Sequence, residues 1–358
     1  MNDPFARPSW PAFLLRYLQD KRAQDQGIYL HDWSDEAHDV YCGYGLAVSS
    51  DVHGGVPYVM YDAAHGGGID WARYECIKAG DIVWVRVDDL EEFERRILPR
   101  CEGRFVLLTT ESDWTLPDAF RDLTQRVLDS GKVGAWFSQN LAAQSSDGVM
   151  RGVPIGPHIS RKNDLLYGQD TSWRGLWGLR DLLRLDRLPV PQVERAWRAL
   201  AAQARPLQER PLRAFADFHL NNSSRWRTYG ESRADIHGLL AGNPLVEFLP
   251  RRLPQTRLLE HYTRHSFVVS PHGGGLDCYR TWEALWMGAI PIVKRSGIDY
   301  LYRDLPVAIL DDWREIAPSR LQAWRDELAP RFQGQRLREV LSMSHWRGQL
   351  RQAADALR

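Results

Sequence analysis

The sequence predicts an α/β protein built from two units in which strands and helices alternate. The chain has 358 residues, a length that suits two domains of ordinary size better than one. Short apolar runs of strand character alternate with amphipathic stretches of helical spacing in both halves. Alternation of this kind favours mostly parallel sheets covered by helices.

The first unit is assigned to residues 1–165. Helices are predicted at 11–25, 90–98 and 119–130 from the spacing of their apolar residues. Strands are predicted at 45–50, 57–62, 81–87, 104–110 and 131–140. A loop rich in proline and glycine at 152–160 closes this unit.

A connector at 166–208, with helical patterns at 173–185 and 193–204, leads to a second domain at 209–325. The strands expected there are 213–218, 245–250, 266–271, 289–295 and 306–311. The helices expected between them are 234–242, 256–265 and 277–288. The tail at 326–358 is expected to be helical and to pack back toward the first domain.

Composition excludes several classes of protein. The formal net charge is zero, whereas nucleic-acid binders usually carry a basic excess. Four scattered cysteines without a CxxC pair indicate a reduced, cytoplasmic protein. Neither a secretion signal nor an apolar run long enough to cross a membrane is present, although a peripheral contact at the inner face of a membrane stays open.

Several familiar motifs are missing from the sequence. It contains no GxGxxG after the first strand and no GxxxxGK[ST], so dinucleotide and P-loop sites lack support. It also contains no HExxH, the motif of many zinc proteases, and no GxSxG, the motif of many serine hydrolases, so these two classes lack support.

The segment 266–293 carries the strongest chemical signal. A buried-strand pattern ends at Ser270, and three glycines at 273–275 form a turn that backbone or ligand can approach closely. The helix expected to open near Leu276 would offer its N-terminal amides to a phosphate. Arg280 could neutralise a diphosphate, and Glu283, three residues later, could accept ribose hydroxyls. A surface Arg–Glu ion pair is the alternative for these two residues.

The run SPHGGGLDCYRTWEALWMGAIPIV at 270–293 resembles the C-terminal signature of the exostosin-like glycosyltransferases. The resemblance extends more loosely through 301–316, and the first 165 residues match only in general layout. The positions that fall on the signature are Ser270, Pro271, Gly273, Gly275, Asp277, Arg280, Trp282, Glu283, Leu285, Gly288, Pro291 and Val293.

This resemblance implies a GT-B enzyme, in which two Rossmann-like domains face a cleft and the C-terminal domain binds the nucleotide-sugar donor. It implies an inverting reaction onto a saccharide or lipid-linked acceptor, without a metal or other cofactor. A place in polysaccharide biosynthesis is expected instead from the arginine-rich, signal-less character of the chain. An arginine after the first strand of the second domain is implied to meet the phosphates, and Arg227 is favoured over Arg225 and Arg233. The expected donor-binding residues are Arg227, Ser270, His272, Gly273, Gly274, Gly275, Asp277, Arg280 and Glu283.

An inverting transferase needs a base that removes the proton of the acceptor hydroxyl. By the same resemblance this base lies in the N-terminal domain. Asp113 and Glu111 directly follow the strand predicted at 104–110, and His65 follows the strand predicted at 57–62. These three residues are the catalytic candidates, and solvated or helix-capping roles are their alternative.

Two other functions stay open at this point. The acidic pairs at 88–89 and 311–312 could bind a metal ion in a GT-A-like transferase. The chain could also be a protein that binds a nucleotide sugar without turning it over.

Overall fold

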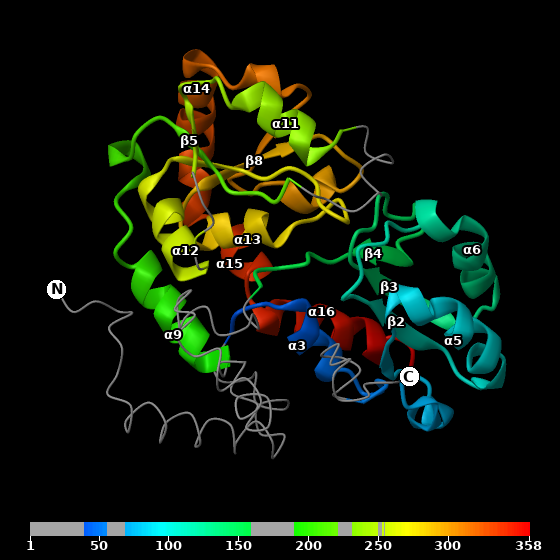
Figure 1. Cartoon of the computed structure of the whole chain (residues 1–358). Coiled ribbons are helices and arrows are strands. Elements are labelled where there is room, and N and C mark those ends of the chain that lie inside the picture. Colours follow the sequence, from blue (N-terminus) through cyan, green and yellow to red (C-terminus); the bar gives the residue numbers. More distant parts are fainter. Residues whose placement is uncertain (1–38, 56–68, 159–189, 221–230, 250–252, 254) are drawn as a thin grey trace, which may run out of the picture.

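The structure is a computed structural model that describes residues 39–55, 69–158, 190–220, 231–249, 253 and 255–358. It has two parallel β-sheets, each covered by helices on both faces (Figure 1). The α/β class predicted from the sequence is confirmed. The helix expected at 11–25, the strand at 57–62 and the helix at 173–185 lie outside the described residues.

The first sheet has four parallel strands in sequential order: β1 (Ile82–Trp84), β2 (Phe105–Thr109), β3 (Val133–Ser138) and β4 (Met150–Gly152). Val52 extends it by a single parallel bridge to Val83. Helices α5 (Leu90–Arg96) and α6 (Arg121–Asp129) pack on one face. Both faces are buried, which is why the strands read as continuous apolar runs.

The opposite face of the first sheet is covered by two helices from the two ends of the described chain. These are α3 (Gly43–Val48) and α16 (Met343–Asp355), which pack side by side against the strands (Figure 1). The expectation that the C-terminal helices pack back toward the N-terminal domain is therefore confirmed for α16. Without α16, only α3 would cover the face that carries Val106 and Leu108.

The strand predicted at 45–50 is wrong, because this segment forms the helix α3. Leu46, Ala47 and Val48 are all buried. A fully buried run of this length has the same apolar pattern as a buried strand, so periodicity alone does not separate the two.

The second sheet has five parallel strands in the order β6-β5-β7-β8-β9. The strands are β5 (Ala214–Ala216), β6 (Val246–Phe248), β7 (Phe267–Val269), β8 (Ile290–Lys294) and β9 (Ala308–Leu310). Helices α11 (Arg233–Leu240) and α14 (Pro318–Leu328) cover one face, and α12 (Gln255–Arg264) and α13 (Tyr279–Trp286) cover the other. The chain runs outward from β5 to β6 and then returns to β7, so the strand order reverses between β5 and β7.

The remaining helices connect the two sheets or complete the tail. They are α9 (Val190–Ala201) and α15 (Gln335–Val340). Short 3-10 helices are η3 (Trp71–Cys76), η4 (Val87–Asp89), η5 (Leu98–Arg100), η6 (Asp118–Phe120), η8 (Leu207–Glu209), η9 (Asp299–Tyr302), η10 (Trp313–Glu315) and η11 (Ala329–Gln333).

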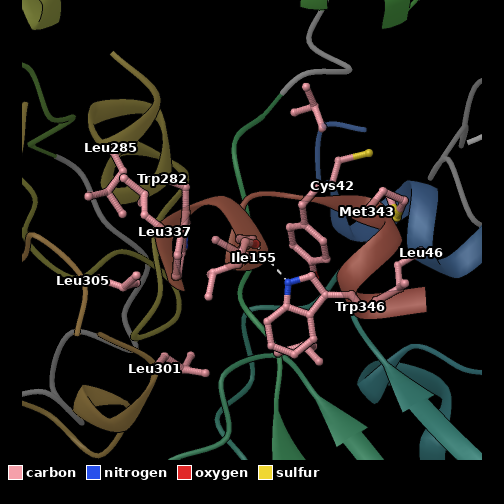
Figure 2. Close-up of a cluster of buried hydrophobic side chains, with 14 of the residues drawn as sticks. Cys42, Leu46, Ile155, Trp282, Leu285, Leu301, Leu305, Leu337, Met343 and Trp346 are labelled. Carbon is pink, nitrogen blue, oxygen red and sulfur yellow. Dashed lines mark hydrogen bonds between the residues drawn. The ribbon is translucent and has the colours of Figure 1, made fainter. Parts of the chain in front are cut away.

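One hydrophobic cluster joins the two sheets. Figure 2 shows side chains of α3, α13, α15 and α16 together with Ile155, Leu301 and Leu305. Trp346 of α16 packs against Tyr41 with their ring centroids 5.8 Å apart, and its indole N–H donates to the Val340 carbonyl at 2.9 Å. The two sheets are thus held in contact by a shared core, close to the loops at their carboxyl ends.

Candidate functional site

The site centres on the loop after β7, which lies beside the carboxyl end of β5. In open α/β sheets, ligands bind outside the carboxyl ends of the strands where the strand order reverses. Arg280, near the start of α13, extends from the β7 side toward β5. Its Nη2 donates to the carbonyl of Asp217, directly after β5, at 2.7 Å. The sequence-predicted donor residues on 270–283 therefore lie where this sheet topology places a ligand.

Polar side chains of the loop form hydrogen bonds within the loop and with α13. Ser270 Oγ lies 2.9 Å from Thr281 Oγ1, and both residues are buried. His272 donates from Nδ1 to the Leu276 carbonyl at 2.8 Å, and burial lowers the pKa of His272. These bonds fix the shape of the turn that the three glycines make.

Arg233, at the start of α11, forms hydrogen bonds with the backbone of the glycine loop. It donates from Nε to the His272 carbonyl at 2.8 Å and from Nη2 to the Pro271 carbonyl at 3.2 Å. Ser232 and Asp235 form a capping box at the start of α11, which fixes Arg233 in the first turn. Arg227, favoured for this region from the sequence, lies outside the described residues, as does Arg225.

The three glycines allow close approach by protein side chains. A Cβ at Gly273 would lie 2.9 Å from Arg233 Nη2, a Cβ at Gly274 would overlap Asp113 Oδ2, and one at Gly275 would overlap the amide of Asn140. None of the three has a positive φ. Glycine is thus needed here for space rather than for backbone conformation.

The helix α13 begins at Tyr279, later than the expected start near Leu276 or Asp277. One of the residues in between, Asp277, is bonded to the first domain. The amide of Asp277 donates to Asn140 Oδ1 at 2.8 Å, and the amide of Cys278 donates to Asp277 Oδ1 at 2.9 Å. These two amides, which the sequence offered to a phosphate, already have protein acceptors.

The carboxylate of Asp277 forms hydrogen bonds with residues of both domains. Its Oδ2 accepts from the Ile155 amide at 2.7 Å, and its Oδ1 accepts from Trp282 Nε1 at 2.8 Å and Tyr302 Oη at 3.3 Å. Burial raises the pKa of Asp277 to about 6, while these hydrogen bonds oppose the rise. In this arrangement the carboxylate joins the loop after β4 to α13.

Arg280 and Glu283 lie on the side of α13 that meets α12 and the segment after β5. Arg280 Nε is buried, and the hydroxyl of Tyr262 on α12 lies close to the same guanidinium. Glu283 is only 4% exposed. Burial lowers the pKa of Arg280, but the nearby acidic groups, Asp217 and Glu283 among them, outweigh this effect and raise it. The pair is therefore not an exposed surface ion pair.

The loop after β2 carries two of the catalytic candidates, and one of them reaches the glycine loop. Asp113 is exposed and its carboxylate lies against Gly274, across the boundary between the two sheets. Glu111 has a φ of 59°, which is rare for a residue with a side chain and concentrates at functional sites. Burial raises the pKa of Glu111 to about 7, although the nearby Arg86 lowers it. His65 lies outside the described residues.

Four residues of this site were missed by the sequence reasoning. Gln139 and Asn140 follow β3, Arg86 follows β1, and Gly43 begins α3, where a Cβ would lie 2.6 Å from Glu111 Oε1. Polar residues directly after buried strands were the available signal for the first three. Nothing in the sequence marked Gly43.

The acidic pairs considered for a metal ion have protein partners. Asp88 Oδ1 accepts from Trp114 Nε1 at 3.0 Å, Asp311 pairs with Arg295 at 2.6 Å, and Asp312 caps η10. Among the described residues, no group of three or more His, Cys, Asp or Glu side chains is placed to hold a metal ion. None of the described helices has the length and apolar character needed to span a bilayer.

A cavity of about 910 Å³ lies at the other end of α13, between α9 and residues 329–342. Its wall includes Arg210, which donates to the carbonyls of Tyr262, His265 and Met287 at the ends of α12 and α13. Cations are favourable at helix C-termini, so Arg210 has a structural role there. The cavity is separate from the glycine loop.

No protein-family model and no curated protein sequence matches the chain. Several solved structures resemble it in part, including the following two. An α,α-trehalose 6-phosphate synthase from Burkholderia multivorans has 13% identity over 80% of this chain and 76% of its own, with a TM-score of 0.41. A UDP-forming α,α-trehalose-phosphate synthase from Burkholderia vietnamiensis has 13% identity over 83% of this chain and 79% of its own, with a TM-score of 0.39. Likenesses this distant do not bear on the function of the chain.

Proposed function

We propose that the chain is a glycosyltransferase of the GT-B type, which transfers a sugar from a nucleotide-sugar donor to a saccharide or lipid-linked acceptor with inversion and without a metal ion. One observation carries the proposal. The Asp113 carboxylate, on the loop after β2, lies against a glycine loop at the strand-order reversal of a second parallel sheet. An acceptor-side base and a donor-side loop are thus within reach of one reacting centre.

The donor side rests on Arg280 and Glu283. Arg280 holds its guanidinium beside the carboxyl end of β5, where a phosphate oxygen would make a charge-assisted hydrogen bond with it. A carboxylate that accepts two ribose hydroxyls would make charge-assisted hydrogen bonds, which are among the stronger ones. We assign the diphosphate to Arg280 and the ribose to Glu283, with Arg233 as the arginine that shapes the loop between them.

A thermal-shift screen tests the proposal. UDP-, GDP-, ADP- and dTDP-linked sugars are each added to the full chain, with the corresponding sugar 1-phosphates as controls. A donor at 100 times its Kd stabilises the folded state by about 2.7 kcal/mol, which raises the melting temperature. A chain that no nucleotide sugar stabilises is not the proposed transferase.

Glu283→Gln tests the donor assignment, because it removes the charge while it keeps the volume of a buried side chain. We expect the affinity for the donor found in the screen to fall by about 2 kcal/mol, or ~30-fold, measured by calorimetry. Glu327→Gln, on an exposed side chain of α14 that pairs with Arg331, is the matched control. Equal donor affinity in the wild type and Glu283→Gln would show that the ribose lies elsewhere.

Two alternatives appear as distinct outcomes of the same assays. Loss of transfer on addition of EDTA would favour a metal-dependent transferase. Donor binding without transfer to any acceptor, and unchanged by substitutions at Asp113 and Glu111, would favour a protein that only binds the nucleotide sugar.

A further inference from the structure

Two buried amide side chains bond to the loop after β2, which carries the candidate base, without being part of the donor site or the base itself. Gln139 and Asn140 directly follow β3 and are 2% and 0% exposed. Buried amides are retained where their hydrogen bonds are satisfied, because an unpaired buried polar group is costly. Their hydrogen bonds identify the backbone segments that they position.

Gln139 fastens the backbone of the loop after β2. Its Oε1 accepts from the Glu111 amide at 3.2 Å, and its Nε2 donates to the Ser112 carbonyl at 3.0 Å. Both bonds lie within the first domain. They hold the backbone at Glu111, where φ is positive.

Asn140 bonds to both domains at once. Its Nδ2 donates to the same Ser112 carbonyl at 3.1 Å, and its Oδ1 accepts from the amide of Asp277 in the second domain at 2.8 Å. Its own carbonyl accepts from the Leu116 amide at 3.1 Å. One planar side chain therefore joins the loop of Glu111 and Asp113 to the end of the glycine loop.

The local backbone suits this arrangement. Asn140 has a φ of 53°, a conformation that asparagine adopts more readily than most residues with a side chain. Gly275 lies directly against the amide, where any Cβ would overlap it. The residue types at both positions thus fit a close approach of the two loops.

We propose that Asn140 is a positioning residue, which sets the distance between the base-bearing loop of the first domain and the donor-binding loop of the second. This inference rests on the proposed function. Asn140 acts through the Ser112 carbonyl and the Asp277 amide, and it needs no contact with the substrates. Misplacement of reacting groups by about 1 Å can cost ~100-fold in rate, so loss of these two bonds should reduce turnover more than donor affinity.

Two variants separate the bonds. Asn140→Gly removes both while it keeps the positive φ at no steric cost. Asn140→Asp keeps the acceptor for the Asp277 amide but cannot donate to Ser112. Asn243→Gly is the matched control, because Asn243 also makes two amide bonds, to Ile316 and Leu245, but both stay within the second domain.

The first measurement is amide hydrogen exchange on the full chain without ligand. We expect Asn140→Gly to speed exchange at 111–116 and at 273–278 together, by ~10-fold or more, because both loops lose a shared partner. Asn140→Asp should affect mainly 111–116, and Asn243→Gly neither segment. Unchanged exchange in Asn140→Gly would overturn the positioning role and leave the proposed function intact.

The second measurement uses the donor that the thermal-shift screen finds. Asn140→Gly should lower kcat by ~10- to 100-fold while the directly measured donor Kd changes less than about threefold. Replacement of a purely structural residue would lower the melting temperature with kcat unchanged, which is the result we expect for Asn243→Gly. The same result for Asn140→Gly would also overturn the inference. A wild-type chain that binds no nucleotide sugar would instead refute the proposed function.

Discussion

At the scale of single residues, Glu111 has the properties expected of a general base. Its backbone conformation is strained, its carboxyl lies against Gly43, and burial raises its pKa to about 7. A base with a pKa near the working pH is the most efficient one. Asp113, two residues later in the chain, is exposed and contacts Gly274 of the glycine loop. The two carboxylates therefore have different surroundings and are separable by experiment.

We expect Glu111→Gln to lower kcat by ~10²- to 10⁴-fold, the usual contribution of a general base. Because the base must be deprotonated, kcat/KM of the wild type should fall as the pH drops below about 7. The pH-rate profiles of Glu111→Gln, Asp113→Asn and the exposed control Glu102→Gln decide the assignment. If only Asp113→Asn abolishes the acidic limb, Asp113 is the base.

The same pKa has a consequence for stability. The folded-state pKa of Glu111 lies above its ordinary value of 4.5, so the folded protein binds the proton more tightly than the unfolded chain does. The wild type should therefore lose stability as the pH rises from about 4.5 to about 7, by an amount on the order of 2 kcal/mol. Urea unfolding across this range should show a flatter dependence in Glu111→Gln. A parallel dependence in both proteins would contradict burial of the carboxyl.

At the scale of elements, the glycine loop is shaped by what packs against it. Arg233, Asp113 and Asn140 occupy the space beside the three glycines. Two of these side chains come from the other sheet, so the loop is also a contact between domains. A methyl group at Gly274 or Gly275 would push the first domain's loops away from it.

Gly274→Ala and Gly275→Ala should each lower the transfer rate by ~10- to 100-fold, since both displace a loop of the first domain from the donor loop. Gly238→Ala on α11 is the control, because a Cβ there meets nothing within 4 Å and alanine favours a helix by about 1 kcal/mol. Transfer assays with the identified donor provide the measurement. Full activity in Gly274→Ala would mean that Asp113 does not lie against the loop during turnover.

At the scale of the whole molecule, the last helix completes the first sheet. α16 packs beside α3 on the face opposite α5 and α6, and Trp346 reaches the core that the two sheets share (Figure 2). Residues at the two ends of the described chain therefore stabilise the same sheet. Unfolding of the first domain should be coupled to release of the C-terminal helix.

Trp346→Ala should destabilise the chain by about 3 to 5 kcal/mol, because it leaves a large cavity in a core. Faster amide exchange should appear in β1, β2 and β3 as well as in α16. Gly348→Ala, on an open part of the same helix, should not destabilise the chain, because alanine favours a helix over glycine by about 1 kcal/mol. A loss of protection confined to α16 would mean that the first sheet does not depend on this helix.

The sequence by itself determined the α/β class, most of the strands and the place of the glycine loop, because apolar runs and turn residues act locally. It also selected Asp113 and Glu111, since polar residues after a buried strand lie at the edge where ligands bind. Only the tertiary structure decided that 43–48 is a helix, that Asp277 joins the domains and that Asn140 bonds to both loops. Each of these depends on a partner more than a hundred residues away, and no local pattern encodes a contact at that separation.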